Sequence, residues 1–412
     1  MTSNVNSESI HDPKSPKRPL NVMFVITSMP VGGAEVLLMN LVRRFDPKRI
    51  KPSICCLKEK DELGEKVSFD IPVFDHQIKH KFDLGVVKRL GKLYLKNKID
   101  AIVTVGAGDK MFWGRLAAKN AGIPIILSAL HSTGWPDGVG RMNRWLTGIT
   151  TGFIACAESH GNFLVEFEKF PKEKVFVIPN GIDTEKFKFN PDARRNWRQQ
   201  LNIPTDAPVV GIVAALRSEK NHPLFVQSAG KVLASVPDAH FIIAGDGPER
   251  PLIESEIASL GIGERVHMIG STSDIPGVLS ATDLFALTSK NEASPVSILE
   301  AMSCERPVVA PSVGSISESV LEGQTGFLVP EGDLDAASGR WIDVLENREL
   351  GTQMGVFARQ HVVANSSLDS MTEGYASLVE QLYYGASRAS DSAPIAPATT
   401  APSTTGSQMP VG

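Results

Sequence analysis

The sequence predicts an α/β protein made of two doubly wound parallel-sheet domains that face each other across a cleft. At 412 residues the chain is too long for a single compact core of ordinary size. Its short apolar runs alternate with longer stretches of helical periodicity, as in parallel sheets whose strands are joined by crossover helices. Because this alternation occurs twice, with a break between the two runs, two domains are expected.

The first run of this alternation begins at Asn21. Its apolar runs predict buried strands, and the periodic stretches between them predict helices. The strands are expected at Val22–Ser28, Ser53–Leu57, Ile71–Phe74, Ala101–Val105, Ile125–Ala129, Phe153–Cys156 and Val175–Pro179. The helices are expected at Ala34–Phe45, Leu84–Asn97, Lys110–Ala121, Asn143–Thr150 and Ser159–Phe167.

The second run begins at Val209, after a stretch in which Asn180-Gly181 and later prolines break the pattern. Its strands are expected at Val209–Leu216, Phe241–Ala244, Val266–Ile269, Leu284–Thr288, Val308–Ala310 and Phe327–Val329. The chain is therefore divided into a first domain over 20–185, a linker over 186–207, a second domain over 208–366 and a terminal helix over 367–385. Residues 1–19 and 386–412, rich in small and polar residues, are predicted to be disordered tails.

Composition and charge narrow the class of protein. The chain is 42% hydrophobic and 21% charged, as in soluble globular proteins. Residues 21–185 carry 23 Lys+Arg against 18 Asp+Glu, a net charge of +5, whereas residues 186–385 carry 15 against 25, a net charge of −10. The first domain is therefore expected to face any anionic surface. No secretion signal or membrane-spanning run is present, so we expect a cytoplasmic protein.

The segment from Glu292 to Glu300 places two carboxylates around the expected start of a helix that follows a strand. A helix N-terminus presents free backbone N–H groups and a partial positive charge, both of which suit a phosphate. Glu300, further along this helix, can accept hydrogen bonds from both hydroxyls of a ribose. The alternative is a capped surface helix with solvated acids. The expected helix start consists of Ser294 as the cap, Pro295 as the first residue, and Val296.

Two cations, Arg217 and Lys220, follow the first strand of the second domain. Ligands of open α/β sheets bind outside the carboxyl ends of the strands, so these cations are well placed for a diphosphate. A solvated basic loop in front of the next helix is the alternative. Gly33 and Gly245 also follow strands, where a glycine allows a ligand to approach the backbone or simply makes a tight turn.

His131 follows the strand Ile125–Ala129 and is expected to reach the same cleft, where an imidazole could bind a sugar hydroxyl or move a proton. A structural or merely exposed loop histidine is the alternative. His76 and His80 lack a third ligand, so no metal site is predicted. The basic stretch Lys79–Lys98 suits either contact with an anionic membrane or an amphipathic helix that covers the sheet. No feature predicts a nucleic-acid partner.

These motifs, taken together and in order, resemble the retaining glycosyltransferases of family 4, which have the GT-B fold of two Rossmann-like domains. The resemblance covers about residues 21–385. It rests on Gly32-Gly33-Ala34-Glu35, His131, Asn180-Gly181-Ile182-Asp183, Lys220, Gly245-Asp246-Gly247-Pro248, the Glu292 to Glu300 pair followed by Ala301-Met302, Gly314 with Glu318, and Gly326-Phe327-Leu328-Val329-Pro330.

The resemblance implies roles for individual residues. Lys220 and a nearby arginine would hold the diphosphate of the donor, and Glu300 would bind its ribose. Glu292 and His131 would contact the transferred sugar. One residue departs from the family, which places its arginine directly before the leucine. Ala215 stands there in this chain, and Arg217 follows Leu216, so Arg217 is expected to act from one residue beyond.

The activity that the resemblance implies is retaining, metal-independent glycosyl transfer of the hexosyltransferase type. The donor would be a nucleotide-diphosphate sugar, with no other cofactor, and the acceptor a glycan or lipid-linked molecule bound by the first domain. Polysaccharide or lipopolysaccharide synthesis is the expected setting, with peripheral contact at the inner membrane face. The alternatives are a sugar-nucleotide epimerase on the same fold and a non-catalytic sugar-nucleotide-binding protein.

Overall fold

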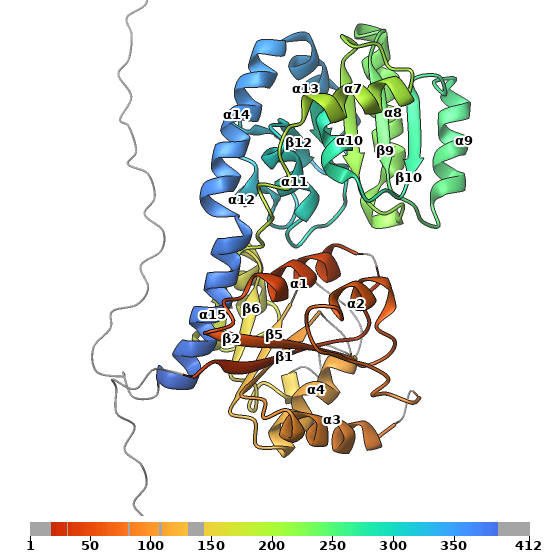
Figure 1. Ribbon diagram of the computed structural model, residues 1–412. Helices are drawn as coiled ribbons and strands as arrows, with labels where there is room; N and C mark the ends of the chain where they lie inside the picture. Colours follow the sequence, from red (N-terminus) through yellow and green to blue (C-terminus); the bar gives the residue numbers. More distant parts are fainter. Residues whose placement is uncertain (1–17, 31, 81–82, 107–108, 131–143, 386–412) are drawn as a thin grey trace, which may run out of the picture.

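The computed structural model describes residues 18–30, 32–80, 83–106, 109–130 and 144–385, and the side chains of all of these except residues 109–111. Its strands form two separate parallel sheets, one of seven strands and one of six. Each sheet with its covering helices forms a lobe, and Figure 1 shows the two lobes one above the other. The predicted α/β architecture of two doubly wound domains is confirmed. The predicted tails lie almost wholly outside the described residues.

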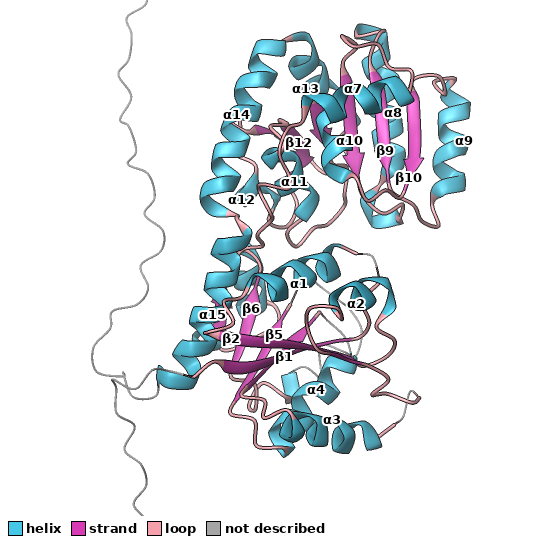
Figure 2. Ribbon diagram, in the orientation of Figure 1, coloured by secondary structure: helices cyan, strands magenta, loops and turns pink. Residues whose placement is uncertain are grey.

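The first lobe is built on the seven-stranded sheet, in the order β3-β2-β1-β4-β5-β6-β7. All of its strand pairs are parallel, and β1 pairs with both β2 and β4. The strands are rich in Val, Ile and Ala. Those inside the sheet are largely buried because helices cover both faces (Figure 2), whereas the edge strands β3 and β7 are partly buried. They are β1 (Leu20–Ile26), β2 (Ile50–Cys56), β3 (Val73–Phe74), β4 (Ala101–Val105), β5 (Ile125–Ala129), β6 (Gly152–Ala155) and β7 (Val175–Val177).

Helices on the two faces of this sheet enclose separate hydrophobic clusters. On one face, α1 and α2 pack against the sheet through residues such as Leu38 and Leu63. On the other face, α3 and α4 do so through residues such as Leu90 and Ala117. The helices are α1 (Gly33–Arg44), α2 (Asp61–Val67), α3 (Gly85–Lys96), α4 (Asp109–Asn120) and α6 (Glu158–Glu166). Of the helix expected over Asn143–Thr150, residues 144 and 145 are helical and turns follow.

The second lobe is built on the six-stranded parallel sheet, in the order β10-β9-β8-β11-β12-β13. Helices α8, α9 and α13 cover one face, and α10, α11 and α14 pack against the other. The strands are β8 (Val209–Val213), β9 (His240–Ala244), β10 (Val266–Gly270), β11 (Leu284–Ala286), β12 (Val308–Pro311) and β13 (Gly326–Val329). The helices are α8 (His222–Ser235), α9 (Arg250–Leu260), α10 (Ile275–Ala281), α11 (Val296–Ser303), α12 (Ile316–Ser319), α13 (Leu334–Glu346) and α14 (Arg348–Asn365).

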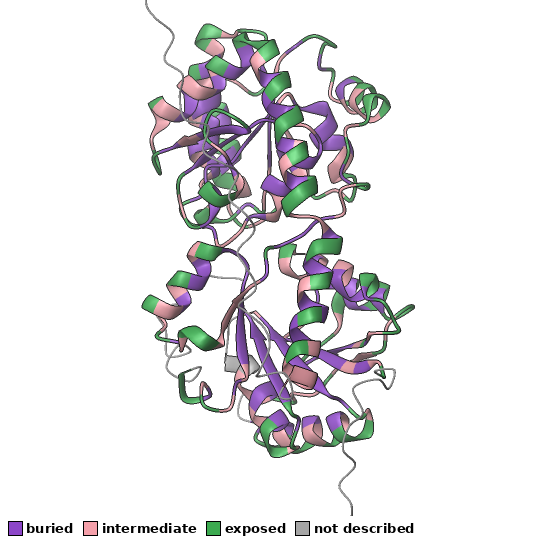
Figure 3. Cartoon of the chain, turned by 90° about the vertical axis from the view of Figure 1, so that its left-hand side faces the viewer, coloured by how far each residue is buried: buried purple, intermediate pink, exposed green. Residues whose placement is uncertain are grey.

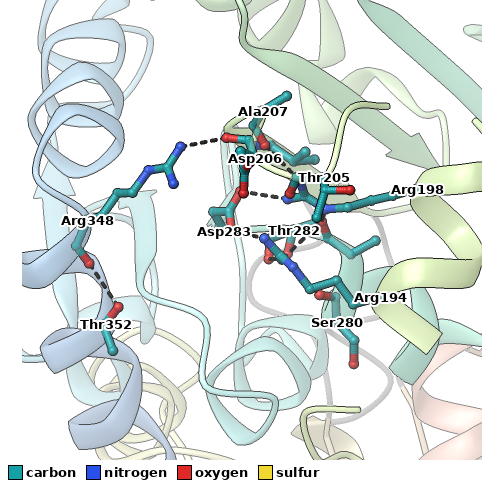
Figure 4. A network of polar contacts seen from close by, with 12 residues as sticks. Arg194, Arg198, Thr205, Asp206, Ala207, Ser280, Thr282, Asp283, Arg348 and Thr352 are labelled. Atoms are coloured by element: carbon teal, nitrogen blue, oxygen red, sulfur yellow. Dashed lines mark hydrogen bonds and ion pairs between the residues drawn. The ribbon is translucent and has the colours of Figure 1, made fainter. Parts of the chain in front are cut away.

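The segment expected as a linker contains helix α7 (Pro191–Gln200), which packs against α10 of the second lobe. Asn190 caps this helix by accepting from two backbone N–H groups, and a proline follows as its first residue. Two arginines of α7 share the carboxylate of Asp283: Arg194 lies 2.6 Å and Arg198 2.8 Å from its oxygens. Figure 4 shows this network, which fastens α7 to the start of β11.

The terminal helix α15 (Leu368–Tyr384) follows α14 but returns to the first lobe. In Figure 1 the two helices run one after the other down one side of the molecule. Met371, Tyr375 and Leu378, which are spaced at helical intervals in the sequence, form a buried stripe that joins the core of the first lobe, and the partly buried Leu382 packs against it. Arg49 of the first lobe reinforces the contact with ion pairs to Glu373 and Glu380 of α15.

Two crossing segments connect the lobes at a narrow waist (Figure 3). They run side by side, because Ile182 donates to the carbonyl of Ser366 and Leu368 donates to the carbonyl of Ile182. Gly181 is needed here, since a Cβ at this position would collide with the backbone of Ser367. The waist therefore holds the lobes together by backbone contacts between the two crossing segments.

Candidate active site between the lobes

The centre of the candidate site is an ion pair between Lys220 and Glu292. Lys220 ends a short 3₁₀ turn (Ser218–Lys220) after β8, and Glu292 lies in the loop after β11. Because β8 and β11 are neighbours in the sheet, their carboxyl ends meet. Lys220 Nζ lies 2.5 Å from Glu292 Oε1, and the two side chains are 24% and 9% exposed. The two loops predicted to carry chemistry are thus joined by a largely buried contact.

Neighbouring hydroxyl groups fix this pair. Ser289 Oγ donates to the same Glu292 oxygen at 2.7 Å. Thr288 Oγ1 donates to the backbone carbonyl of Lys220 at 3.0 Å, and Lys290 N donates to the carbonyl of Glu219 at 2.9 Å. Such partners restrict the rotamers and the backbone of a charged pair before any ligand arrives. The site is therefore preorganised by the sheet edge itself.

Arg217 lies at the mouth of the site. Its side chain is 65% exposed and its Nη1 stands 3.9 Å from Glu219. Across the cleft stands Glu35, in the first turn of α1. Burial raises the pKa of the Glu35 carboxyl, and the Arg217 guanidinium acts in the opposite direction. Arg217 thus faces the first lobe, while the neighbouring Ala215 is also exposed.

Helix α11 begins at Val296, one residue later than predicted. Pro295 occupies the N-cap position and no side chain caps the helix, so the expected capping role of Ser294 is wrong. The carbonyl of Ser294 instead accepts from Asn180 Nδ2 at the waist, at 3.3 Å. Val296 contacts hydrophobic clusters of both lobes. The start of α11 therefore lies where the lobes meet, with its first N–H groups free of side-chain acceptors among the described residues.

Glu300 lies on α11 and has no hydrogen bond or ion pair among the described residues that joins it to the Lys220–Glu292 pair. Burial raises the pKa of its carboxyl to about 7, and the nearby Lys186 partly opposes this effect. An acid whose charge is this poorly solvated gains from a ligand that donates hydrogen bonds to it. The structure thus leaves Glu300 with unused acceptor capacity.

The glycines expected near the site differ in their structural surroundings. Nothing lies within 4 Å of a Cβ built at Gly33, so space is open beside the first turn of α1. Gly245 has a φ of 145° and packs on the backbone of Ala214, which no larger residue could do. Gly314 packs in the same way on the carbonyl of Glu292. Gly245 and Gly314 therefore bring neighbouring loops together at the sheet edge.

A cavity of about 390 Å³ lies between the lobes. Its walls come from the N-terminal part of α6 in the first lobe and from the loops after β11 and β12 in the second. Asn291 and Ala293, on either side of Glu292, are among its lining residues, together with Ser159, His160, Phe163, Gly314 and Ser315. The cavity thus adjoins the loop that carries Glu292.

Other predicted residues fall outside this constellation. His131 lies outside the described residues. His76 contacts Asp75 at 3.3 Å, and the described part of the chain has no cluster of three or more His, Cys, Asp or Glu side chains suited to a metal ion. No described helix is both long and apolar enough to cross a bilayer. Sequence reasoning missed Ser289, although two hydroxyl residues directly after an apolar strand were a signal.

Comparisons with known proteins match nearly the whole described chain. Residues 193–361 match the family model described as glycosyl transferases group 1, and residues 31–186 match that of glycosyltransferase family 4. The chain is 27% identical to a putative glycosyltransferase, EpsF, of Bacillus subtilis over 317 residues, which are 73% of this chain and 80% of the relative.

The chain is also similar to a second glycosyltransferase and to a solved structure. The chain is 27% identical to the UDP-Gal:alpha-D-GlcNAc-diphosphoundecaprenol alpha-1,3-galactosyltransferase of Escherichia coli over 302 residues, 70% of this chain and 78% of the relative. The crystal structure of Anabaena Alr3699/HepE in complex with UDP matches with a TM-score of 0.78 at 22% identity, and the match covers 88% of this chain and all of that one. This structure supports the fold.

Proposed function

Because this chain belongs to the group 1 and family 4 glycosyltransferases, we propose that it moves a sugar from a nucleoside diphosphate donor to a glycan or lipid-linked acceptor in cell-envelope or polysaccharide synthesis. The observation that carries the proposal is the Lys220–Glu292 pair at the carboxyl edge of the second sheet, close to the start of α11. A cation and a helix N-terminus together suit a diphosphate.

The donor diphosphate would lie between Lys220 and the start of α11. As the bond from the anomeric carbon to the phosphate oxygen breaks, negative charge grows on that oxygen. Lys220, Arg217 and the free N–H groups of α11 would stabilise this charge. Lys220 suits the role best, since its ammonium is already fixed by Glu292 and only 24% of its side chain is exposed.

We propose that the transfer retains the configuration at the anomeric carbon. The acceptor oxygen would form its bond on the face from which the diphosphate leaves, and the acceptor proton would pass to the departing phosphate oxygen. Glu292 supports this route over a covalent intermediate, because its Oε1 accepts from both Lys220 and Ser289. A carboxylate held in this way is better suited to accept hydrogen bonds from sugar hydroxyls than to attack carbon.

Glu300 is proposed to bind the ribose hydroxyls of the donor. Burial raises the pKa of the Glu300 carboxyl, and no hydrogen-bond partner of this carboxyl lies among the described residues. Two hydroxyl donors would therefore offset the free-energy cost of burying its charge. Gly33, with open space beside it, would let the first lobe approach the donor closely. His131 is proposed to contact the transferred sugar, as the family resemblance implies.

The acceptor is proposed to bind to the first lobe and to be glycan or lipid-linked. The Escherichia coli relative takes a diphosphoundecaprenol acceptor and a UDP-linked sugar, as its name states. Helix α3 supports a membrane contact, because one of its faces packs on the sheet and the opposite face is exposed and basic. Val86, Leu90 and Tyr94 pack on the sheet, and an exposed face carries Lys88, Lys92 and Lys96.

A thermal-shift or calorimetric screen with UDP, GDP, ADP and their common sugar conjugates tests the proposal. In the thermal-shift measurement a ligand that binds the folded protein raises its stability. We expect one base to bind, with release of free nucleoside diphosphate when an acceptor is present. Conversion of the donor sugar with no acceptor would indicate an epimerase. Binding without any release, across a broad acceptor panel, would indicate a non-catalytic protein.

A further inference from the structure

Helix α6 of the first lobe begins without a cap of its own. Ala157 occupies the N-cap position in an extended conformation, and its methyl side chain cannot accept a hydrogen bond. The first N–H groups of a helix have no intrahelical acceptor and need one from elsewhere. The start of α6 therefore depends on a group from outside the helix.

That group is Glu318 of the second lobe, on the short helix α12. Its two carboxylate oxygens accept from the backbone N–H groups of Glu158 and Ser159, at 2.8 and 2.7 Å. The contact joins residues 160 positions apart and crosses between the lobes. A carboxylate at this position is favoured twice, by charge-assisted hydrogen bonds and by the partial positive charge of the helix N-terminus.

The same contact continues into the candidate active site. Glu318 follows Gly314 and Ser315 closely in sequence, and these two residues pack on the loop that carries Glu292. Gly314 lies against the carbonyl of Glu292, and Ser315 Oγ donates to the carbonyl of Ala293. The 390 Å³ cavity between the lobes lies beside this chain of contacts. The start of α6 is thus linked to the Lys220–Glu292 pair through one carboxylate and one packed loop.

We propose that Glu318 is a positioning residue, a clasp that caps α6 from the opposite lobe and thereby sets the closed arrangement in which the first lobe meets the Lys220–Glu292 pair. The contact between the lobes does not depend on any activity of the protein. Its role in positioning the active site rests on the proposed glycosyl transfer. Because these hydrogen bonds join the two lobes, moving the lobes apart would break them, and their free energy therefore favours the arrangement in which the lobes meet. The side chain is exposed, so added salt weakens the clasp.

The test compares Glu318→Ala, Glu318→Gln, and Glu318→Ala combined with Ala157→Ser. The added serine supplies α6 with a cap from its own chain, so it repairs the helix without restoring the contact between lobes. Three quantities are measured: the radius of gyration by small-angle scattering, the thermal midpoint, and the rate of UDP release from UDP-galactose in the presence of a lipid-linked glycan acceptor. Calorimetric binding of UDP serves as the control for the second lobe.

Glu318→Ala is expected to enlarge the radius of gyration and to slow UDP release about fivefold to tenfold, with UDP affinity changed less than about twofold. Glu318→Gln, which keeps one acceptor oxygen, should lie between this variant and the wild type. In the double variant the thermal midpoint should recover, while the size and the slow release should persist.

If the double variant recovers the wild-type radius of gyration and rate of UDP release, Glu318 acts only as a helix cap and the proposal is overturned. Unchanged scattering and release in Glu318→Ala would overturn it as well. If no variant and no wild-type protein binds or turns over a UDP sugar, the proposed function fails for that donor, and the scattering comparison still decides whether Glu318 holds the lobes together.

Discussion

Nζ of Lys220 and Oε1 of Glu292 stand 2.5 Å apart at the carboxyl edge of the second sheet. Each residue follows a different strand, and the two meet only because β8 and β11 are adjacent. The same parallel pairing that builds the sheet therefore places a cation beside a buried carboxylate.

Substitution Lys220→Ala should lower turnover by about a hundredfold, the typical loss when a preorganised charge-stabilising donor is removed. Removing the ammonium also leaves Glu292 buried without its charge partner, which costs stability. The double variant Lys220→Ala, Glu292→Gln separates the two effects, since it should regain stability but not turnover. Lys231→Ala, on the exposed side of α8, is the matched control. Turnover of Lys220→Ala equal to that of the control would contradict the assignment.

Arg217→Ala should have a smaller effect, less than about tenfold on turnover, because the Arg217 side chain is 65% exposed and its ion pair with Glu219 is long, at 3.9 Å. Adding Ala215→Arg to this variant places an arginine at the position the family uses. Steady-state kinetics of the single and double variants show which position reaches the diphosphate. A loss as large as that of Lys220→Ala would mean that Arg217 moves deeper into the site when donor is bound.

Treatment with a chelator should leave turnover within about twofold of its starting value, since the charge that grows on the leaving phosphate is met by Lys220, Arg217 and the start of α11. The measurement is the rate of nucleoside diphosphate release before and after dialysis against EDTA. Loss of activity that Mg²⁺ or Mn²⁺ restores would show that a metal ion shares this role.

Much of the fold could be predicted, because each strand is a local apolar run. β4 and β5 have the predicted bounds, and most other strands have at least one end within about two residues of its predicted position. The docking of α15 on the first lobe could not be predicted in this way. Its buried stripe was visible in the sequence, but a stripe does not say which surface covers it, and the partner lies more than 300 residues earlier, at Arg49.

The candidate site was predictable where residues follow strands directly, as Lys220 and Glu292 do. Features that depend on local backbone conformation or on the arrangement of the two lobes could not be predicted. Pro295 takes the N-cap position because its φ of −72° and ψ of 112° lie outside the helical region, which moves the helix start past Ser294. The contact of Glu318 with α6 could not be inferred either, since only the arrangement of the two lobes brings them together.

Neutralising the exposed face of α3 should weaken binding to anionic vesicles. The variant Lys88→Gln, Lys92→Gln, Lys96→Gln removes three charges that do not contact the core, so the fold should be unaffected. Each lysine near an anionic surface contributes roughly 1 kcal/mol, so co-sedimentation should fall by at least tenfold. Wild-type binding that is no stronger to anionic than to neutral vesicles would remove the membrane contact from the proposal.

Glu300 should make both stability and nucleotide binding depend on pH. Burial raises its folded pKa from 4.5 to about 7, so between these values the folded protein keeps a proton that the unfolded chain has lost. Stability should therefore fall as the pH rises through this window, and Glu300→Gln should raise the thermal midpoint at pH 8 but hardly at pH 4.

Nucleotide binding should show the opposite trend, because the ribose hydroxyls are proposed to donate to the ionised carboxylate. The affinity for the nucleoside diphosphate should weaken by up to about tenfold for each pH unit below 7 and level off above it. Glu300→Gln should bind more weakly at pH 8 and lose this pH dependence, whereas Glu305→Gln, on a neighbouring turn, should keep it. Calorimetry at three pH values measures both trends. A wild-type affinity that stays constant between pH 5.5 and pH 8 would place the ribose elsewhere, because the raised pKa of Glu300, the acid proposed to bind it, lies within that interval.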